Sequence, residues 1–433
     1  MKFLLPLQLL FLISILKLNA SVGEIFGPSA LSAGLGNQFV PNTSDSANNY
    51  HLPALLAFDG KSHSSINISR IQSTFSDINS VVTENSLTAN LDSTGNIETD
   101  YEAQSILAAH LALPAGKSNK SVFGFSIFTP LSPGIESQTG DPFRPEYVMY
   151  RGRFTQSQLF FNYARKFNEQ HSWSVGVYTG IQVASRIESR IALSPLSTSS
   201  GSLQAKAEAS LAGRLSYAYK WNQKNISGLN INQEMKSNLE VSNLGETADP
   251  NLIYNLDIKS LLHYSPWEFK LTHMLTTGRW NFLGTVEYQV WSNYESPLIR
   301  IRNLGGNVQP SSDLERLNLR NIFIGRLGTK YDLSEKWNLM FGLAYRQSPL
   351  QGDFSGAGNS VDANSFMASL GASYRFSQSL SLTGSIQSHE LISKNVRKTD
   401  GLEDGTAGSK IGSPGYEIGG RTTSIALGLQ FYL

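Results

Sequence analysis

The C-terminal stretch SIALGLQFYL, residues 424–433, alternates small or polar side chains with large apolar ones. A period of two places Ile425, Leu427 and Leu429 on one face of a β-strand and their neighbours on the opposite face. In a soluble sheet such an apolar face would cover a core, whereas in a membrane barrel it would face lipid while the other face lines a polar lumen. The rest of the chain decides between these two interpretations.

The same alternation recurs upstream, in residues 173–183, 203–221 and 280–290. These runs exceed the globular average of about 5 to 6 residues and match the roughly 9 to 11 residues of a tilted membrane strand. We therefore predict an all-β fold, a transmembrane antiparallel β-barrel of about fourteen strands. The predicted strands are 62–73, 102–113, 120–130, 153–167, 171–186, 204–221, 225–243, 252–275, 279–293, 318–331, 336–348, 364–376, 379–391 and 420–433.

The connections between these strands alternate in length, as in outer-membrane barrels. Long connections follow the odd-numbered strands, for example residues 77–100, 131–152 and 393–419. Short turns are predicted near Gly116, Glu169, Gln223, Gly278, Ser334 and Gln378. Because lipid tolerates no open sheet edge, we expect the last strand to pair with the first.

Aromatic residues gather beside the short turns, as an interfacial belt requires. They are Tyr163, Phe167, Trp173, residues 217–221, Trp280, Tyr331, Trp337, Tyr374, Phe376 and Phe431. Aromatic residues also favour strands in general, so the belt is a second indication and not a proof.

Composition narrows the class of protein further. Charged residues make up 16% of the chain and aromatic residues 10%, although a soluble domain usually carries about a quarter charged residues. The net charge of +1 gives no electrostatic case for nucleic acid, and the absence of cysteine excludes disulfides and thiolate ligands. Residues 1–20 are typical of a cleaved signal peptide, with Lys2, an apolar run and Leu18-Asn19-Ala20. We predict export to the outer membrane of a Gram-negative bacterium.

Residues 21–61 show no strand alternation and are rich in small residues. Such a segment is either a loose extension or a compact piece tucked inside the lumen. Glycines and small side chains permit close packing in a confined space, which favours an N-terminal hatch, or plug, inside the barrel formed by residues 62–433.

The order of these parts resembles the FadL/TodX family of outer-membrane transporters for hydrophobic compounds. That family opens with Ser-Ala-x-x-x-Gly-x-Gly, an acidic residue and Asn-Pro-Ala. The matching residues here are Ser29, Ala30, Gly34, Gly36, Asp45, Leu52, Pro53 and Ala54, with Leu52 in place of the family's Asn. Weaker similarities follow in order at residues 123–130, 286–292, 343–349 and 370–376.

The resemblance implies a fourteen-stranded barrel closed by a hatch, with a pocket for hydrophobic ligands inside and a kink in the third strand that opens the wall sideways. The hatch residues would include Gly34, Gly36, Pro53 and Ala54. We place the lateral opening at Gly124, Ser126 and Pro130, because Gly and Pro weaken a strand ladder locally. The alternative is that Pro130 only ends the strand.

Charged residues of the lumen-facing parity are Lys206, Glu208, Arg214, Glu234, Lys236, Glu240, Glu287, Arg326, Arg346 and Arg375. Unpaired buried charge is costly, so we expect most of them to brace wall and plug as ion pairs. The sharper hypothesis is that Arg214 or Arg326 receives the carboxylate of a fatty acid-like ligand, for which a guanidinium is well suited. Lys206 is a further candidate ligand-binding residue.

Apolar residues at the end of the third predicted strand and in the long connection after it form an outer landing groove for lipid-like ligands, or else pack the long loop upon itself. These residues are Phe128, Leu131, Phe143, Tyr147 and Met149.

Three rival classes remain. An enzyme is not indicated, because the seven histidines form no catalytic or metal-binding spacing, and we predict no catalytic residue, cofactor or metal. A polar porin fits poorly with a forty-residue plug. A plugged structural or adaptor barrel without transport stays open. The expected partners are hydrophobic small molecules, outer-membrane lipids and the barrel-assembly machinery, and the expected state is a monomer.

Overall fold

The C-terminal strand closes the sheet, as its alternation and the ban on open edges predict. In the computed structural model, β21 (Gly415–Tyr432) pairs antiparallel with β1 (His63–Phe75), so that the last strand meets the first. The structure describes residues 28–40, 45–83, 93–97, 103–116, 119–131, 157–181, 186–194, 197–207, 210–245, 254–294, 300–303, 319–350, 362–397 and 415–432.

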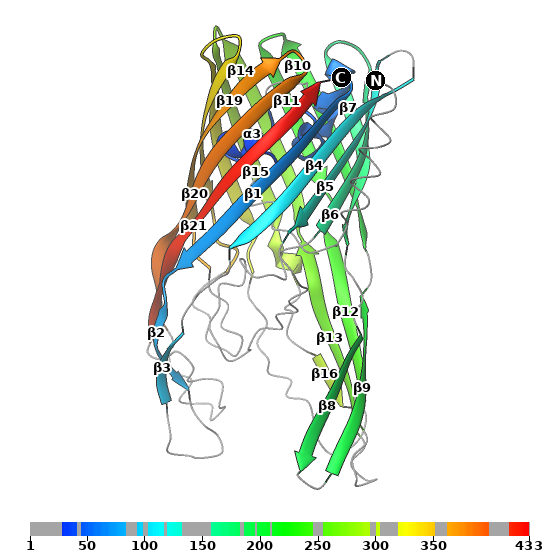
Figure 1. The fold of residues 1–433 in the computed structure, drawn as a ribbon, viewed down its shortest axis with the longest axis vertical. Coiled ribbons are helices and arrows are strands. Elements are labelled where there is room, and N and C mark those ends of the chain that lie inside the picture. The colour runs from blue at the N-terminus through cyan, green and yellow to red at the C-terminus, as the bar shows by residue number, and fades with distance from the viewer. Residues whose placement is uncertain are drawn as a thin grey trace.

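Within these residues, fourteen strands form one closed antiparallel barrel, and each pairs with its neighbours in sequence order (Figure 1). Between β1 and β21 the barrel strands are β4 (Gln104–Ala115), β5 (Ser121–Pro130), β6 (Ser157–Lys166), β7 (His171–Ile181), β10 (Leu211–Asn222), β11 (Asn225–Asn232), β14 (Trp267–Thr277), β15 (Trp280–Val290), β17 (Ile322–Asp332), β18 (Trp337–Arg346), β19 (Ser365–Ser377) and β20 (Leu380–Arg397). The predicted fold class is confirmed.

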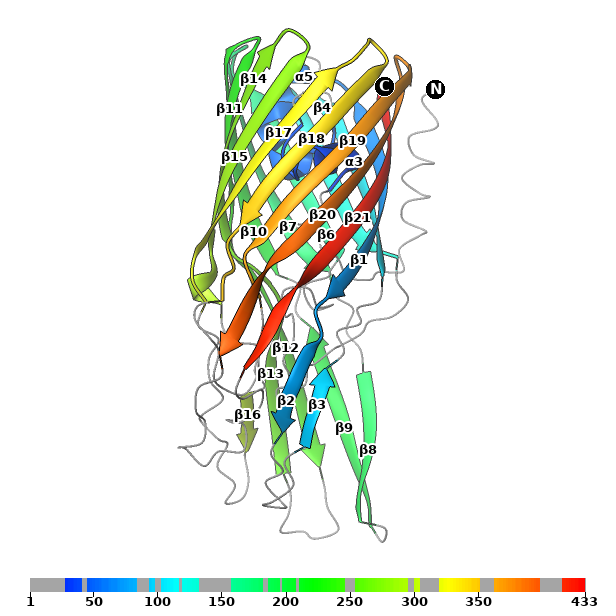
Figure 2. The ribbon, with the colours of Figure 1, turned by 90° about the vertical axis from the view of Figure 1, so that its left-hand side faces the viewer.

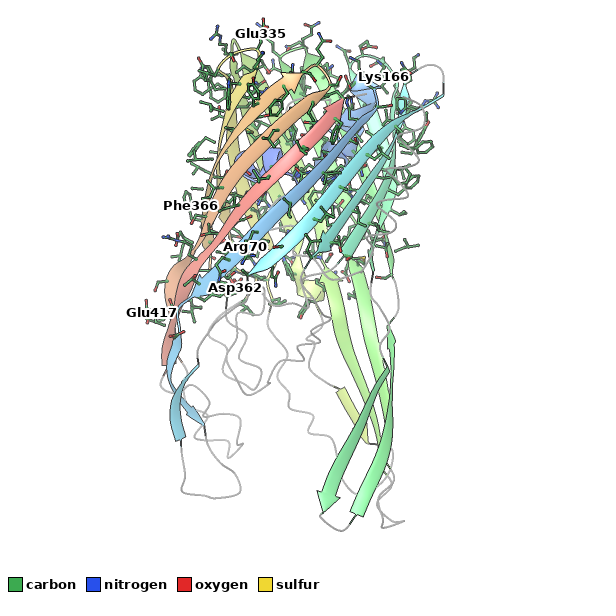
Figure 3. The ribbon with its side chains drawn as sticks, in the orientation of Figure 1. Arg70, Lys166, Glu335, Asp362, Phe366 and Glu417 are labelled. Carbon is green, nitrogen blue, oxygen red and sulfur yellow. The ribbon has the colours of Figure 1, made fainter. Side chains whose placement is uncertain are left out.

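The outer surface of the barrel is apolar and the inner side is polar. On β21, Ile425 and Leu427 are 56% and 53% exposed, while Ser424 and Gln430 are buried. Figure 3 shows Lys166 and Glu335 at one end of the barrel, Asp362 and Glu417 toward the other, and Phe366 on the outer face between them. This inverts a soluble protein's arrangement, and it is what a wall between lipid and a lumen requires.

The short turns join strands at one end of the barrel, as predicted. Residues 278–279 join β14 to β15, and residues 378–379 join β19 to β20. Aromatic rings pair at this end: the Trp280 and Tyr331 ring centroids lie 4.4 Å apart and those of Trp337 and Tyr374 4.7 Å apart. The expected interfacial belt is therefore present on this side.

Three of the predicted strands are each two separate strands in the structure, one in the barrel and one beyond it, so their predicted lengths are wrong. The strands predicted at 204–221, 225–243 and 252–275 are interrupted after Ala207, at residues 233–234 and at Pro266. Pro266 cannot donate to a strand ladder, which explains the third break. The strand predicted at 171–186 likewise ends as β7 at Ile181.

The outer halves form a second sheet that projects past the barrel mouth (Figure 2). Its order is β16 (Arg300–Asn303), β13 (Tyr254–Ser265), β12 (Met235–Gly245), β9 (Ser197–Ala207) and β8 (Arg186–Ser194). A third, two-stranded sheet of β2 (Ile78–Thr83) and β3 (Ser93–Ile97) lies within the connection predicted at 77–100.

Four short helices lie inside the barrel (Figures 1 and 2). They are α3 (Ala30–Gly34), α4 (Asn48–His51), the 3-10 helix η1 (Pro53–Leu55) and α5 (Leu56–Asp59). We call residues 28–40 and 45–60 the plug. Another 3-10 helix, η4 (Trp291–Asn293), follows β15.

Among the helices of the described residues, none is long and apolar enough to cross a membrane.

Candidate functional site

Wall side chains hydrogen-bond to the backbone of the plug. Asn67 on β1 accepts a hydrogen bond from the backbone N–H of Ala30 at 3.1 Å. On β20, Gln387 donates to the carbonyl of Ala33 at 2.8 Å. These bonds satisfy backbone groups that would otherwise be buried without partners, so the wall and the plug fit each other specifically.

The two predicted hatch glycines lie where the plug touches the wall backbone. A Cβ on Gly34 would lie 3.2 Å from the Cα of Gly371, and the Gly34 carbonyl accepts a hydrogen bond from Ser369 at 3.1 Å. Gly36 has a φ of +84°, and a Cβ there would lie 3.2 Å from the Leu327 carbonyl oxygen. A side chain at Gly34 would require the wall to shift by a few tenths of an ångström, and one at Gly36 would in addition be strained by the positive φ.

Pro53 and Ala54 sit at the opposite wall. Pro53 begins η1, where its missing N–H costs nothing. The N–H of Ala54 donates to the Ser216 hydroxyl at 2.9 Å, and the Ser172 hydroxyl donates to the Ala54 carbonyl at 2.5 Å. Leu52, which stands where the family motif has Asn, is fully buried in an apolar cluster shared by plug and wall.

Arg214 on β10 holds α4 against the wall. Its guanidinium donates to the Asn232 side chain at 2.7 Å, to the Asn49 carbonyl at 3.1 Å and to the Tyr50 carbonyl. The same group lies 4.8 Å from the centroid of the Phe160 ring. Arg214 is 3% exposed, and these hydrogen bonds to the plug backbone hold the plug against the wall. A role in receiving a ligand carboxylate stays a prediction.

The residues predicted for lateral opening face the plug or end their strand. The Ser126 hydroxyl bonds the His110 ring nitrogen Nδ1 at 2.8 Å and accepts a hydrogen bond from the Asn49 side chain at 2.8 Å. A Cβ on Gly124 would lie 2.6 Å from Cγ of Asn49. Pro130 is the last residue of β5, whose pairing with β4 and β6 shows no register shift over the described residues.

An aromatic cage lines the wall beside α4, near the ends of the strands that lie away from the short turns. It consists of Phe128, Phe160 and Tyr178, from β5, β6 and β7, and it surrounds the plug residue Tyr50. The Tyr50 ring centroid lies 5.2 Å from that of Phe128 and 5.1 Å from that of Phe160. The Phe160 and Tyr178 rings are stacked 5.4 Å apart. All four rings are buried.

Phe128 is thus a correction to the predicted landing groove, because it belongs to the lumen wall and not to an outer loop. The neighbouring Leu131 follows β5 and is 45% exposed. Phe143, Tyr147 and Met149 lie outside the described residues. Lys206 lies in β9, where its backbone pairs with that of Glu240 in β12, beyond the barrel.

A small polar cavity of about 20 Å³ adjoins the cage, between the plug and strands β14, β15 and β17. On its wall Arg326 pairs with Glu287 at 3.0 Å, and Lys270 pairs with Glu268 at 2.8 Å and with Glu287 at 3.7 Å. The lining residues are Asn37, Gln38, Phe39, Tyr50, His51, Lys270, Thr272, Thr285, Glu287 and Arg326. The structure thus places one predicted site residue, Arg326, in a cavity.

His51 enters the same cavity from α4. Burial, and then the nearby charges of Lys270 and Arg326, hold the pKa of His51 well below its ordinary value, so the ring is neutral at physiological pH. Its Nε2 is buried and has no hydrogen-bond partner among the described residues. A neutral ring with an open nitrogen suits a hydrogen-bonding group of a guest.

Sequence reasoning missed Tyr50, His51 and Lys270, and also the cage residues Phe160 and Tyr178. Tyr50 and His51 belong to the plug, which has no periodicity from which side-chain directions can be predicted. Lys270 could have been predicted to face the lumen. It lies on β14 on the same face as Thr272, and Phe269 and Leu271 occupy the opposite, lipid-facing side. No metal-binding cluster of His, Asp or Glu occurs among the residues that the structure describes.

Comparisons with known proteins agree with this architecture. A family model described as outer membrane protein transport protein (OMPP1/FadL/TodX) matches residues 33–413. The alkane uptake protein A of Marinobacter nauticus is 20% identical over 317 residues, which cover 66% of this chain and 66%, just under two thirds, of that relative.

Two solved structures share the fold at low sequence identity. A FadL homologue of Pseudomonas aeruginosa has a TM-score of 0.63 at 14% identity, covering 95% of this chain and 99% of its own. The toluene transporter TodX of P. putida has a TM-score of 0.54 at 12% identity, covering 94% of this chain and 99% of its own.

Proposed function

Because this chain belongs to the outer membrane protein transport protein (OMPP1/FadL/TodX) family, we propose that it passively transports hydrophobic molecules, fatty acid-like or aromatic, across the outer membrane. The protein lies in the outer membrane of a Gram-negative bacterium. Its guest enters the lumen from the side of the long connections, binds against the plug and leaves after the plug shifts.

The observation that carries this proposal is the pairing of an aromatic cage with a polar cavity on the same side of the plug. The cage offers buried apolar surface to a hydrocarbon, while Arg326 and Lys270 in the adjoining cavity can meet a polar head group. An open aqueous pore needs neither feature. The plug also fills the lumen with apolar side chains, including Leu35, Leu52 and Leu55.

Lateral exit into lipid between β5 and β6 is the second part of the proposal. These strands carry aromatic rings on both faces: Phe128 and Phe160 toward the lumen, and Phe125 and Phe161 toward lipid, with centroids 4.9 Å apart. A guest passing here would leave one aromatic surface for another without rehydration. The plug contacts this wall at Gly124 and Ser126, so the plug would separate from the wall at these positions.

A disulfide between plug and wall tests the plug movement. The chain has no cysteine, so the pair Asn49→Cys and Gly124→Cys would form the sole disulfide. The Sγ of Asn49→Cys would take roughly the place of Asn49 Cγ, 2.6 Å from the position of a Cβ at residue 124, which suits a bridge. We expect the oxidised double variant to lose uptake of radiolabelled oleate and toluene by cells, and dithiothreitol to restore it.

Two controls complete this experiment. The Asn49→Cys single variant should transport in both redox states, and heat-modifiable mobility on gels should show that every variant folds. Full uptake through the locked barrel would show that the plug need not move. No uptake through the unmodified protein would instead favour the alternative, a plugged adaptor barrel without transport.

A further inference from the structure

We propose that the short-turn ends of strands β5, β6 and β7 carry a binding site for the headgroup of an anionic phospholipid. The site consists of Lys120, Ser121, Tyr163, Arg165 and Trp173, and we call it the headgroup site. It faces the membrane and the rim of the barrel, away from the lumen, so it goes beyond the transport proposed above and does not depend on it.

The depth of the site in the membrane follows from its aromatic residues. The ring centroids of Tyr163 and Phe167 lie 6.0 Å and 6.2 Å from that of Trp173, within the interfacial belt at the short-turn end. Such belts lie at the level of the lipid headgroups. Short turns of outer-membrane barrels lie on the periplasmic side, where the leaflet consists of phospholipid. A phospholipid headgroup therefore lies at the level of this site.

Two cations give the site its positive charge. Arg165 is exposed on the outward face of β6 and Lys120 is exposed just before β5, and neither forms an ion pair among the described residues. The neighbouring Lys166, at this end of the barrel in Figure 3, pairs with Glu169 at 2.9 Å. The hydrogen bond and charge of Lys166, and then the charges of Lys220 and Lys120, hold the pKa of Glu169 below its ordinary value. The surroundings of Arg165 and Lys120 are thus basic, which favours an anion.

The other polar groups of the site supply further hydrogen-bond donors. Arg165 is the register partner of Ser121 on one side and of Trp173 on the other. The hydroxyls of Tyr163 and Ser121 share one hydrogen bond at 2.9 Å, so that pair uses only one of its two hydrogens. The Nε1 of Trp173 has no hydrogen-bond partner among the described residues, and its neighbours would have to turn aside to admit an acceptor. A lipid phosphate, which only accepts hydrogen bonds, matches these donors.

Apolar surface for acyl chains adjoins the donors on the outer wall. The rings of Phe123 and Phe161 are stacked with centroids 5.8 Å apart, and the Phe125 ring lies 4.9 Å from that of Phe161. All three are exposed, as is Val175 on β7. Acyl chains lying on this surface stay within the hydrocarbon of the bilayer. Donors at the rim beside an apolar wall fit a lipid, whereas a free anion would use the donors alone.

Native mass spectrometry of the purified full-length protein, titrated with lipid in detergent, tests the site. The probes are palmitoyl-oleoyl phosphatidylglycerol and palmitoyl-oleoyl phosphatidylcholine, which have the same acyl chains and differ in headgroup charge. We expect the first phosphatidylglycerol to bind at least fivefold more tightly than the first phosphatidylcholine. The double variant Lys120→Gln, Arg165→Gln should reduce this preference to less than twofold.

The matched control is the double variant Lys224→Gln, Lys336→Gln. It removes the same charge from two other exposed positions in short turns, and it should keep the full preference for phosphatidylglycerol. Equal losses in the two double variants would overturn the proposal, because the preference would then belong to the charge of this barrel end as a whole. Heat-modifiable mobility on gels should show that both variants fold.

Two measurements on the unmodified protein decide the matter even if the first double variant does not fold. Equal affinities for phosphatidylglycerol and phosphatidylcholine would overturn the proposal. Millimolar inorganic phosphate should leave bound phosphatidylglycerol in place, since the free anion gains nothing from the apolar wall. Displacement by inorganic phosphate would show a site for free anions and would overturn the assignment to a lipid.

Discussion

Arg326 is the residue at which a carboxylate guest is best tested. Arg214 already donates hydrogen bonds to plug carbonyls. Arg326 instead lines the cavity and pairs with Glu287. If Arg326 is replaced, Glu287 still has Lys270 as an ion-pair partner. We expect Arg326→Gln to weaken oleate binding about tenfold, since one charge-assisted hydrogen bond is worth roughly 1.5 kcal/mol. Equilibrium binding of labelled oleate checks this.

The matched control is Arg346→Gln, which removes a guanidinium that pairs with Asp362 at 3.2 Å away from the cavity. It should leave oleate binding unchanged. Equal losses in the two variants would mean that general lumen charge, and not Arg326, attracts the guest.

Asp45 makes the plug pH-dependent. Burial raises the pKa of Asp45 to about 6 from 3.8, although its carboxylate accepts a hydrogen bond from the Ala47 N–H. The folded plug thus binds this proton more tightly than the unfolded chain does, and its stability falls as the pH rises from about 4 through about 6. We expect plug amides to be better protected from hydrogen exchange at pH 5 than at pH 7.5, after correction for intrinsic rates.

Asp45→Asn keeps an acceptor for the Ala47 N–H but cannot ionise. This variant should show the same protection at both pH values. A dependence that survives the substitution would have to come from another group.

At the scale of elements, the contact between plug and wall depends on glycines of the wall strands. A Cβ on Gly342 of β18 would lie 2.6 Å from the Cα of Gly36 in the plug. Gly342→Ala should therefore push the plug off this wall, raising hydrogen exchange in residues 30–40 by at least tenfold. Gly325→Ala on the adjacent strand is the matched control, because a Cβ there meets nothing within 4 Å. Equal exchange in the two variants would show that the plug adapts to the added methyl group.

The strands could be predicted from the sequence because a single rule decides which side chains face lipid and which face the lumen. Lipid outside and a polar lumen inside impose a period of two, and residues 425–430 follow it in burial as in sequence. The same period continues past the membrane into the second sheet, so nothing in the alternation marks where the barrel ends. Pro266 was the one local signal of that boundary.

The candidate site was less predictable because it depends on contacts between distant segments. Parity correctly placed Arg214 and Arg326 inside the barrel, but it could not tell which one the plug engages. The plug has no period at all, and Tyr50 reaches its cage only because β5, β6 and β7 bring three aromatic residues together.

At the scale of the whole molecule, the barrel and the projecting second sheet are separable. β11 and β14 pair directly with each other over residues 225–232 and 268–275, so the hairpin of β12 and β13 adds nothing to barrel closure. Ser237 and His263 are register partners, and a two-residue turn can join them. We expect a variant in which such a turn replaces residues 238–262 to keep its heat-modifiable mobility on gels.

Removal of β19 and β20 from the barrel itself is the control, and it should abolish that mobility. A shortened protein without β12 and β13 that no longer folds would show that the projecting sheet takes part in assembly.

The seam between β1 and β21 joins residues that are more than three hundred positions apart, as in the pair His63 and Tyr432. A truncation that removes the final strand would strip hydrogen-bond partners from two strands at once, β1 and β20, and both would present bare backbone to the hydrocarbon. Loss of the final strand therefore prevents closure of the barrel, and the remaining strands cannot form a stable wall in lipid.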